Sequence, residues 1–402
     1  MNEQMKAIAA KYKDEIVRTA SELIQINSQS LHEGEVAGYI RKKMEDLGYD
    51  EVVVDRYGSI FGTVKGSGGG CSVTLNCHMD VVDAGDESRW KRPPYGGVVE
   101  EGRIWGRGAS DTKGTMAIQL YTPVLLREAG LLPKGDVVTS CVIAEEIAGF
   151  GTMVQTRENR MLTDYAIIGE ATENNLSIGS RGRCCVRITI TGKSCHASRP
   201  DLGCNPFDYL KFLLPELDKV ELGRDELFGK SSMCVTKIES SEKGTNVIPG
   251  EVVVYLDYRQ TGEDTEDRVQ AKMEKTLERC QGSVAGVTAK AEILYFPLTT
   301  YTGVEDRGYQ GEYPFLVRED DPHVIQAKAA IEEAVGHPIG IKAWDLATDT
   351  GHLAAKGVKC LGYSPAEERL CHTVEDSISI EMMEEGIVGY LGVTAALANN
   401  PK

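Results

Sequence analysis

The chain has 402 residues, of which 41% are hydrophobic and 26% charged, proportions typical of a globular protein with room for two domains. Its formal net charge of −17 argues against nucleic acid and anionic membrane as partners, because both require basic patches. The polar start MNEQMKAIAAKYKDEIVRTA lacks the form of a secretory signal, and no apolar run approaches the roughly 20 residues of a membrane span, so a cytoplasmic location is expected.

The first 180 residues alternate helical and strand patterns. Apolar residues at helical spacing, such as Ile8, Tyr12 and Ile16, predict a helix over 4–26, and a second helix is predicted over 34–47. Short apolar strands are predicted at 51–54, 60–64, 72–76, 137–144 and 165–168, with a helix near 115–129. The pattern predicts an α/β fold with a mostly parallel sheet flanked by helices, and residues 1–180 are assigned to the first part of a catalytic domain.

Residues 181–297 form a different and self-contained pattern. A strand over 185–191, a helix near 205–219, strands over 232–239 and 251–258, a helix near 264–280 and a strand over 288–296 follow the ferredoxin-like order β-α-β-β-α-β. This α+β unit is expected to be an inserted dimerisation or lid domain, because candidate site residues lie on both sides of it.

The α/β pattern resumes in residues 298–402, which are assigned to the second part of the catalytic domain. A helix over 322–335, a strand over 358–363 and a terminal helix from about 378 are predicted. Residues 298–320 are rich in Tyr and Gly and are predicted to form a long loop, which in a compact domain is usually functional or mobile.

Five short segments carry side chains of the types that bind metal ions. They are Asn76-Cys77-His78-Met79-Asp80, Gly106-Arg107-Gly108-Ala109-Ser110-Asp111, Ala144-Glu145-Glu146-Ile147, Ile168-Gly169-Glu170 and Cys371-His372-Thr373. Together they offer two imidazoles and several carboxylates, which suits one site for two divalent ions with positions open for water. His78, Glu145 and Glu170 lie at or just past the C-terminal ends of predicted strands, where the ligand sites of open α/β sheets collect.

These segments resemble those of the M20 peptidases, and the most specific stretch is WKRPPYGGVVEEGRIWGRGASDTKG at residues 90–114. That family comprises dinuclear zinc amidohydrolases and exopeptidases, including succinyl-diaminopimelate desuccinylase, acetylornithine deacetylase, aminoacylase and carboxypeptidase G. The resemblance covers essentially the whole chain. It implies a metal ligand set in which one ion is held by His78 and Glu170, the other by Glu146 and His372, and Asp111 bridges the two. Zinc suits these nitrogen and oxygen ligands, and cobalt or manganese would fit as well.

The same resemblance implies roles for five further side chains. Asp80 orients the first metal-binding histidine, and Glu145 is the general base that accepts a proton from water and returns it to the leaving amine. His196 stabilises the developing oxyanion, reaching the site from the other subunit of a homodimer. Arg259 matches an arginine that grips a substrate carboxylate, and Asn246 is its companion.

The expected activity is hydrolysis of the amide bond of an N-acyl amino acid or small peptide with a free carboxylate. A carbamoyl or cyclic amide hydrolase on the same scaffold is the alternative, and so is a non-catalytic assembly protein, although the intact Glu145 argues against the latter. Asp83 replaces a common proline, and Ala144 replaces a polar residue, which leaves the subfamily open. The segment Ser194-Cys195-His196 and the Tyr-rich loop most resemble those of a branch of the family labelled as selenium-metabolism hydrolases.

The eleven cysteines include no C-x-x-C motif and are expected to be reduced thiols. Cys77, Cys195 and Cys371 each precede a histidine of interest, which raises a Cys/His nucleophile or a thiolate metal ligand as a rival hypothesis. Because neighbouring side chains on a strand point to opposite faces, these cysteines are instead expected to pack into the core.

Overall fold

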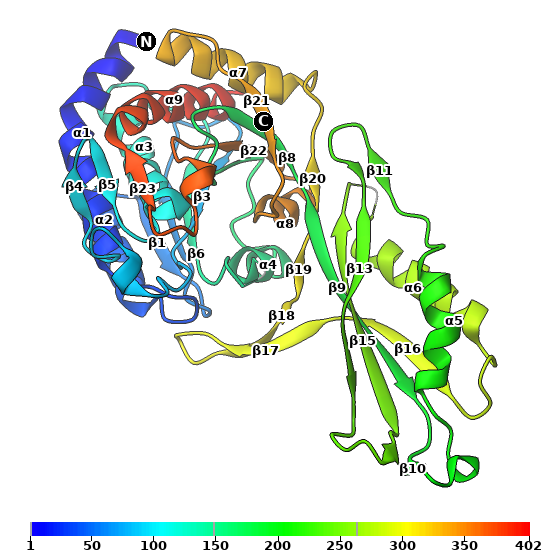
Figure 1. Ribbon diagram of the computed structural model, residues 1–402. Helices are drawn as coiled ribbons and strands as arrows, with labels where there is room; N and C mark the ends of the chain where they lie inside the picture. Colours follow the sequence, from blue (N-terminus) through cyan, green and yellow to red (C-terminus); the bar gives the residue numbers. More distant parts are fainter. Residues whose placement is uncertain (1, 148, 263) are drawn as a thin grey trace.

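The computed structural model describes residues 2–147, 149–262 and 264–402. Two bodies are visible in Figure 1: a larger one that contains both chain termini, and a smaller, elongated one built around β9 (Gly182–Thr191). Within the described residues, no helix has the combination of length and apolar character needed to cross a membrane.

The larger body is organised around one mixed sheet. Its central strands β6 (Val137–Val142), β3 (Val73–His78), β7 (Tyr165–Ile168) and β22 (Lys359–Tyr363) pair in parallel. The sheet is extended by β2 (Ile60–Val64) and β1 (Glu51–Val54) at one end and by β8 (Leu176–Ser180), β20 (Phe315–Leu316) and β21 (Ile341–Trp344) at the other. All residues of β2, β3, β6, β7 and β8 are buried, as expected for sheet strands that are covered on both faces.

Helices cover this sheet. Four of them form one packed group: α1 (Asn2–Gln25), α3 (Gly114–Glu128), α7 (Pro322–Val335) and α9 (Ile380–Ala398). Within this group, α3 and α9 contact β3. The helix α2 (Gly34–Asp46) packs on β1 and β2, while α8 (Thr350–Ala354) contacts β22 and α4 (Phe150–Arg157). The α/β fold with a parallel-containing sheet flanked by helices is thus confirmed.

A small antiparallel sheet that the sequence patterns did not predict joins two distant parts of the larger body. It consists of β4 (Val98–Glu100), β5 (Arg103–Trp105) and β23 (Ser377–Ser379), with Ser377 opposite Trp105. The short helical segments η1 (Glu87–Arg89), η2 (Ala109–Lys113) and η4 (Glu368–Leu370) flank these strands in the chain. This sheet brings the segment that carries Asp111 next to the segment that carries His372.

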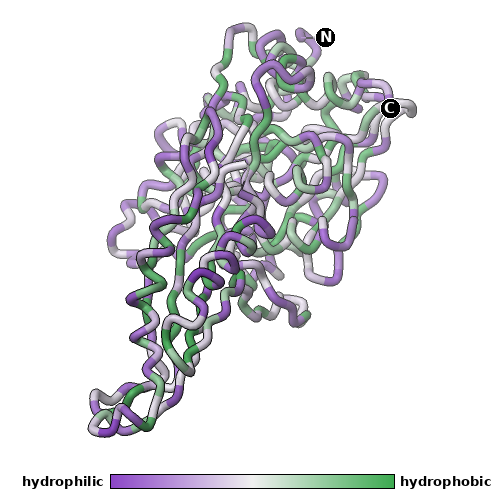
Figure 2. The backbone as a smooth tube through the Cα atoms, turned by 90° about the vertical axis from the view of Figure 1, so that its right-hand side faces the viewer, coloured by the Kyte–Doolittle hydropathy of each residue, from purple (hydrophilic) through white to green (hydrophobic). Residues whose placement is uncertain are grey.

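The smaller body has the predicted ferredoxin-like order of elements. It runs through β9, α5 (Phe207–Leu217), β13 (Ser232–Ser240), β15 (Glu251–Gln260), α6 (Glu266–Cys280) and β16 (Thr288–Ile293). Its antiparallel sheet has the strand order β13-β15-β9-β16 and a hydrophobic core of its own. Along its helices, hydrophobic and hydrophilic residues alternate (Figure 2), as expected when one helix face packs on a sheet.

Short elements complete the smaller body. They are β10 (Cys195–His196) paired with β14 (Val247–Ile248), β11 (Arg224–Asp225) paired with β12 (Gly229–Lys230), and η3 (Pro200–Leu202). The pair β10 and β14 lies at the end of the smaller body that is farthest from the larger body (Figure 1).

Two predictions near residue 300 are wrong. The strand predicted over 288–296 is interrupted after Ile293, and β17 (Tyr295–Thr299) pairs instead with β18 (Glu305–Tyr309). The long loop predicted over 298–320 contains short strands, because β18 lies within it, β19 (Gly311–Glu312) joins β9 and β20 joins β8. Local sequence patterns could not reveal the pairings of β19 and β20, since their partner strands lie more than a hundred residues away in the chain.

The hairpin of β17 and β18 extends from the smaller body to the larger one. Tyr301 at its tip donates a hydrogen bond to the carbonyl oxygen of Gly58, 2.9 Å away, and its ring occupies the space that a side chain at Gly58 would need. Gly58 also has a φ of +108°, a conformation that L side chains rarely adopt, so glycine is required there. Because 295–316 contacts both bodies, the domain boundaries at 180/181 and 297/298 stay a prediction.

Candidate active site

The five predicted ligand residues converge at the C-terminal edge of the central strands. His78 ends β3, Glu146 follows β6, and Glu170 follows β7. Asp111 lies in η2 immediately before α3, and His372 follows η4. His78, Asp111 and Glu170 are buried, and parallel strands whose carboxyl ends share one edge explain why residues so far apart in sequence meet here.

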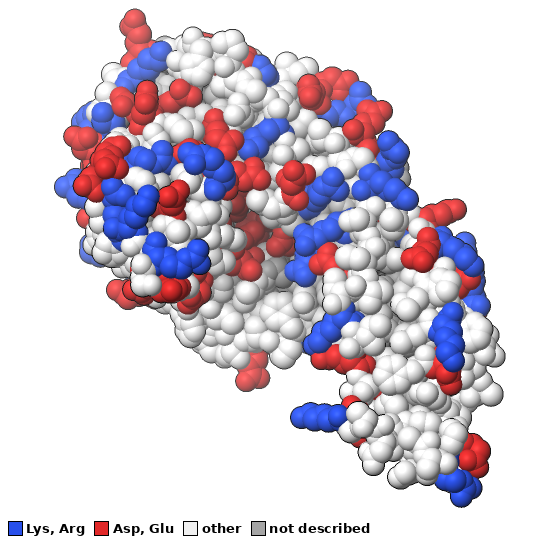
Figure 3. Space-filling view, viewed as in Figure 1, with Lys and Arg blue, Asp and Glu red and all other residues white. Residues whose placement is uncertain are grey.

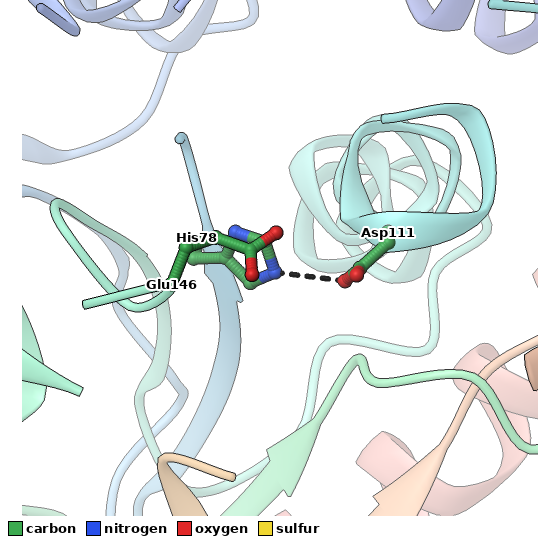
Figure 4. A group of neighbouring side chains, drawn as sticks. All are labelled: His78, Asp111 and Glu146. Atoms are coloured by element: carbon green, nitrogen blue, oxygen red, sulfur yellow. Dashed lines mark hydrogen bonds and ion pairs between the residues drawn. The ribbon is translucent and has the colours of Figure 1, made fainter. Parts of the chain in front are cut away.

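Asp111 lies between the two histidines. Its Oδ1 atom is 3.0 Å from Nε2 of His78, and its Oδ2 atom is 2.9 Å from Nε2 of His372. Figure 4 shows the side chains of His78, Asp111 and Glu146 directed toward one another from β3, η2 and the segment after β6. One carboxylate that presents each oxygen to a different imidazole has the geometry required of a bridging ligand.

Each histidine also has a glutamate beside it. Oε1 of Glu146 is 3.0 Å from Nε2 of His372, and Oε1 of Glu170 is 3.5 Å from Nε2 of His78. Among the residues that the structure describes, potential ligand atoms within 4.8 Å of one another form two groups: His78, Asp111 and Glu146, and His78, Glu145 and Glu170. The donor set of imidazole nitrogens and carboxylate oxygens suits zinc and similar divalent ions.

The electrostatics of the site also favour bound cations. Burial raises the pKa of Glu145 and of Glu170 well above the usual range. Burial lowers the pKa of His78, but hydrogen bonds to Asp111 and Asp80 outweigh this effect and raise it well above its ordinary value. Several carboxylates held together in a buried place are costly to ionise without positive charge nearby, and divalent cations supply that charge.

Asp80 contacts more than the histidine that it was predicted to orient. Its backbone carbonyl is 2.8 Å from Nδ1 of His78, whereas its carboxylate oxygen Oδ1 is 3.5 Å from the same nitrogen. The carboxylate accepts hydrogen bonds from the backbone N–H groups of Glu145 (3.0 Å) and Glu146 (3.2 Å) and from the hydroxyl of Ser30 (2.7 Å). Asp80 therefore fixes the backbone of the adjacent glutamates as well as the imidazole ring.

A second buried carboxylate, Asp376, connects the Asp111 turn with the His372 segment. It accepts hydrogen bonds from the backbone N–H groups of Gly108 (2.8 Å) and Ser110 (2.9 Å) and from Nη1 of Arg107 (3.2 Å). The same Nη1 nitrogen donates to the carbonyl of Thr373 at 3.2 Å. Sequence reasoning missed Asp376, because its partners lie more than 250 residues away in the chain.

Three other acids near the site, two of them buried, were also missed. Glu33 is fully buried, Asp349 is 1% exposed, and Glu312 is partly exposed beside Glu146. Burial raises the pKa of Asp349 to about 7 and that of Glu312 to about 8. In the sequence each is a single acid without a nearby pattern, so nothing local distinguished these residues from surface carboxylates.

Two adjoining cavities open onto the cluster. The first, of about 360 Å³, is lined by Asp111, Glu145, Glu146, Glu170 and His372 among others. The second, of about 510 Å³, is lined by Arg259, which was predicted to bind substrate, together with Arg183. Both cavities share Glu146 and Glu312 as walls, so a ligand at the metal cluster can extend toward the arginines.

His196 and Asn246 lie elsewhere in the chain. His196 belongs to β10 at the distal end of the smaller body, and its Nδ1 atom is 2.8 Å from the hydroxyl of Ser198. Asn246 is exposed next to it, and the backbone carbonyl of Asn246 accepts a hydrogen bond from the backbone N–H of Ala197 at 3.0 Å. Within one chain, the structure does not bring these two residues to the cluster.

The cysteines beside the histidines are only partly as expected. Cys77 packs in the core, whereas Cys195 and Cys371 are only partly buried. Burial raises the pKa of the Cys77 thiol well above its usual value and raises that of Cys371 strongly. Thiols held in this way are poor nucleophiles, which counts against the rival Cys/His hypothesis at Cys77 and Cys371.

Comparison with known proteins gives concordant results. A family model described as Peptidase family M20/M25/M40 matches residues 74–395. The protein named "Uncharacterized protein YgeY" of Escherichia coli (strain K12) is 26% identical over 371 residues, covering 90% of each chain. The succinyl-diaminopimelate desuccinylase of Alkalilimnicola ehrlichii is 27% identical over 376 residues, covering 90% of this chain and 94% of that protein.

Solved structures show the same fold. The YXEP protein of Bacillus subtilis, described as a dinuclear metal binding peptidase from the M20 family, superposes with a TM-score of 0.65. The alignment covers 96% of this chain and 98% of that one at 15% sequence identity, a level at which the likeness shows the fold alone.

Proposed function

The chain belongs to peptidase family M20/M25/M40 and is a hydrolytic enzyme of the metallopeptidase type; from this premise we propose that it cleaves the amide bond of an N-acyl amino acid or small peptide that carries a free carboxylate. The observation that carries the proposal is Asp111, whose two oxygens face two different histidines. We expect two divalent ions, zinc above all, with cobalt or manganese as substitutes.

The proposed ligands divide into two sets around Asp111. His78 and Glu170 hold one ion, Glu146 and His372 hold the other, and Asp111 bridges them. Two distances support this proposed pairing: Oε1 of Glu170 lies 3.5 Å from Nε2 of His78, and Oε1 of Glu146 lies 3.0 Å from Nε2 of His372. Divalent ions held by these residues would lower the pKa of a bound water and polarise the carbonyl oxygen of the substrate.

Glu145 is the proposed general base. It is buried beside His78 and Glu170, and burial raises its pKa, which favours proton acceptance from water. Glu145 then returns this proton to the nitrogen of the leaving amine. Asp80, through its hydrogen bond with the backbone N–H of Glu145, is proposed to hold the base in place while it also orients His78.

The substrate is held by residues of the smaller body. Arg259 lines the cavity next to the metal cluster and is proposed to bind the substrate carboxylate. His196 is proposed to stabilise the oxyanion from the partner subunit of a homodimer, with Asn246 nearby, since its own chain places it at the distal end of the smaller body. The cytoplasm remains the proposed location.

The direct test is metal content together with substrate preference. Protein purified without chelator should contain close to two equivalents of divalent metal and should hydrolyse members of a panel of N-acyl amino acids and dipeptides. The corresponding carboxamides should be poorer substrates. A protein that holds no divalent metal yet hydrolyses the panel would contradict the proposal.

A further inference from the structure

Two arginines lie directly opposite each other in the smaller body. Arg183 of β9 pairs with Arg259 of β15, so both side chains lie on the same face of the sheet. Like charges at directly opposed positions of neighbouring strands are destabilising. Such a pair therefore requires a compensating negative charge.

Asp257 supplies part of this charge and aligns both side chains. Its Oδ2 atom accepts a hydrogen bond from Nε of Arg183 at 2.8 Å, and its Oδ1 atom accepts one from Nε of Arg259 at 2.7 Å. One carboxylate neutralises one of the two guanidinium charges and leaves the other uncompensated. None of the described residues accepts a hydrogen bond from the Nη nitrogens of these two arginines. These N–H donors are therefore available to a ligand.

The arginine pair lines the cavity that adjoins the metal cluster. That cavity of about 510 Å³ is bounded by Arg183, Arg259 and Glu312, and also by the proposed metal ligand Glu146. Figure 3 shows acidic side chains inside the hollow between the two bodies and basic side chains on the neighbouring wall of the smaller body. A ligand that spans the cavity meets carboxylates at one end and guanidinium groups at the other.

The strand register places Glu312, Arg183 and Arg259 in one row, with Glu312 at the end nearer the metal cluster. Glu312 of β19 is opposite Arg183, and Arg183 is opposite Arg259. Glu312 also lines the cavity of the metal cluster, whereas neither arginine does. The arginine end of the row attracts a substrate carboxylate, which places the amide of the substrate on the side of the metal cluster.

We propose that Arg183 is a second specificity-determining residue, which together with Arg259 clamps the carboxylate of the substrate. This inference rests on the proposed function and deepens it, because it assigns recognition of the free carboxylate to two guanidinium groups that Asp257 holds in position. A single surface arginine at a strand end would not need a carboxylate such as Asp257 to hold it in position. Two arginines that face one cavity form a preorganised site for an anion.

Binding without turnover tests the clamp independently of catalysis. Metal-loaded Glu145→Gln protein, which lacks the proposed base, is titrated calorimetrically with N-acetyl-L-alanine and with N-acetyl-L-alaninamide. We expect the carboxylate form to bind at least about ten-fold more tightly than the amide. Adding Arg183→Gln should weaken binding of the carboxylate about ten- to hundred-fold and leave binding of the amide unchanged, because hydrogen bonds to charged groups are strong.

The remaining variants separate a clamp from a structural role. Arg183→Lys keeps the charge but loses the planar fork, so it should bind the carboxylate with intermediate affinity. Adding Arg259→Gln to Arg183→Gln should cost less than the product of the two single effects, because both groups act on one carboxylate. Arg187→Gln is the matched control: Arg187 lies on the same face of β9 but pairs with Glu292, outside this cavity.

The outcomes distinguish the clamp from the broader proposal. Equal binding of the two ligands, or carboxylate binding that Arg183→Gln does not change, would overturn the clamp. Hydrolysis of N-acetyl-L-alanine by the wild-type chain is measured in parallel. Its absence, combined with carboxylate-selective binding that depends on Arg183, would count against the proposed reaction and leave the clamp supported.

Discussion

Glu33 accepts a hydrogen bond at its Oε1 atom from the backbone N–H of Ala144, 3.0 Å away, and so holds the residue that precedes the two site glutamates. The same oxygen accepts a hydrogen bond from the backbone N–H of Leu31 at 2.9 Å. Ala144 has a φ of +51°, an uncommon conformation for a residue with a side chain. Glu33 thus fixes a strained turn from a position outside the residues that the family model matches.

Because Glu33 is fully buried, its carboxyl group makes the stability of the folded chain depend on pH. Burial raises its pKa from 4.5 to about 7, with a further contribution from the charge of Asp80. The folded state therefore binds the proton more tightly than the unfolded state, and stability falls as pH rises from about 4.5 to about 7. We expect Glu33→Gln, which cannot ionise, to reduce the loss of unfolding free energy between pH 5 and pH 8 by up to about 3 kcal/mol.

Urea unfolding of metal-free protein at both pH values measures this effect. Metal-free protein is used so that metal release does not contribute. Glu35→Gln changes an exposed glutamate in the first turn of α2, two residues after Glu33, and should leave the pH dependence of the wild type unchanged. Parallel pH profiles for wild type and Glu33→Gln would show that Glu33 ionises in the fold as readily as in the unfolded chain.

Metal removal should abolish activity and lower stability. Because ligands from five segments meet at the site, each bound ion should stabilise the folded chain by about 2.7 kcal/mol when free metal is 100 times its dissociation constant. Chelation should therefore lower the melting temperature and eliminate hydrolysis, and added zinc, cobalt or manganese should restore both. Full activity in protein shown by elemental analysis to lack metal would contradict the ligand assignment.

The two adjacent glutamates should respond differently to the same substitution. Glu145→Gln should keep both ions and lose roughly 10²- to 10⁴-fold in kcat, because proton transfer by a positioned side chain contributes that much. Glu146→Gln should instead lose affinity for the ion beside His372, since Oε1 of Glu146 lies 3.0 Å from its Nε2 atom. Metal content and kcat are measured for both variants, and the reverse pattern would exchange the two roles.

Sequence patterns predicted the residues of the metal cluster better than the residues that hold the cluster in position. Ligands such as His78 and Glu170 could be found because they follow apolar strands whose ends share one sheet edge. Glu33 could not, since its partner Ala144 lies 111 residues away and only the folded chain joins them. The strands β19 and β20 were missed for the same reason, because their partners β9 and β8 lie outside any local pattern.

His196 provides the test of assembly. It lies at the distal end of the smaller body and does not meet the cluster of its own chain, so the proposed role requires a second subunit. If so, mixing His196→Ala chains with Glu145→Gln chains should restore activity, because one site of the heterodimer then combines an intact base with an intact partner histidine. The expected recovery is about half of the native activity per heterodimer, since the other site lacks both groups. Mixing either chain with one that carries both substitutions is the control and should restore nothing. Activity is measured alongside subunit exchange, for example by mass-tagged chains, and mixtures that exchange fully yet stay inactive would show that His196 does not act across a dimer.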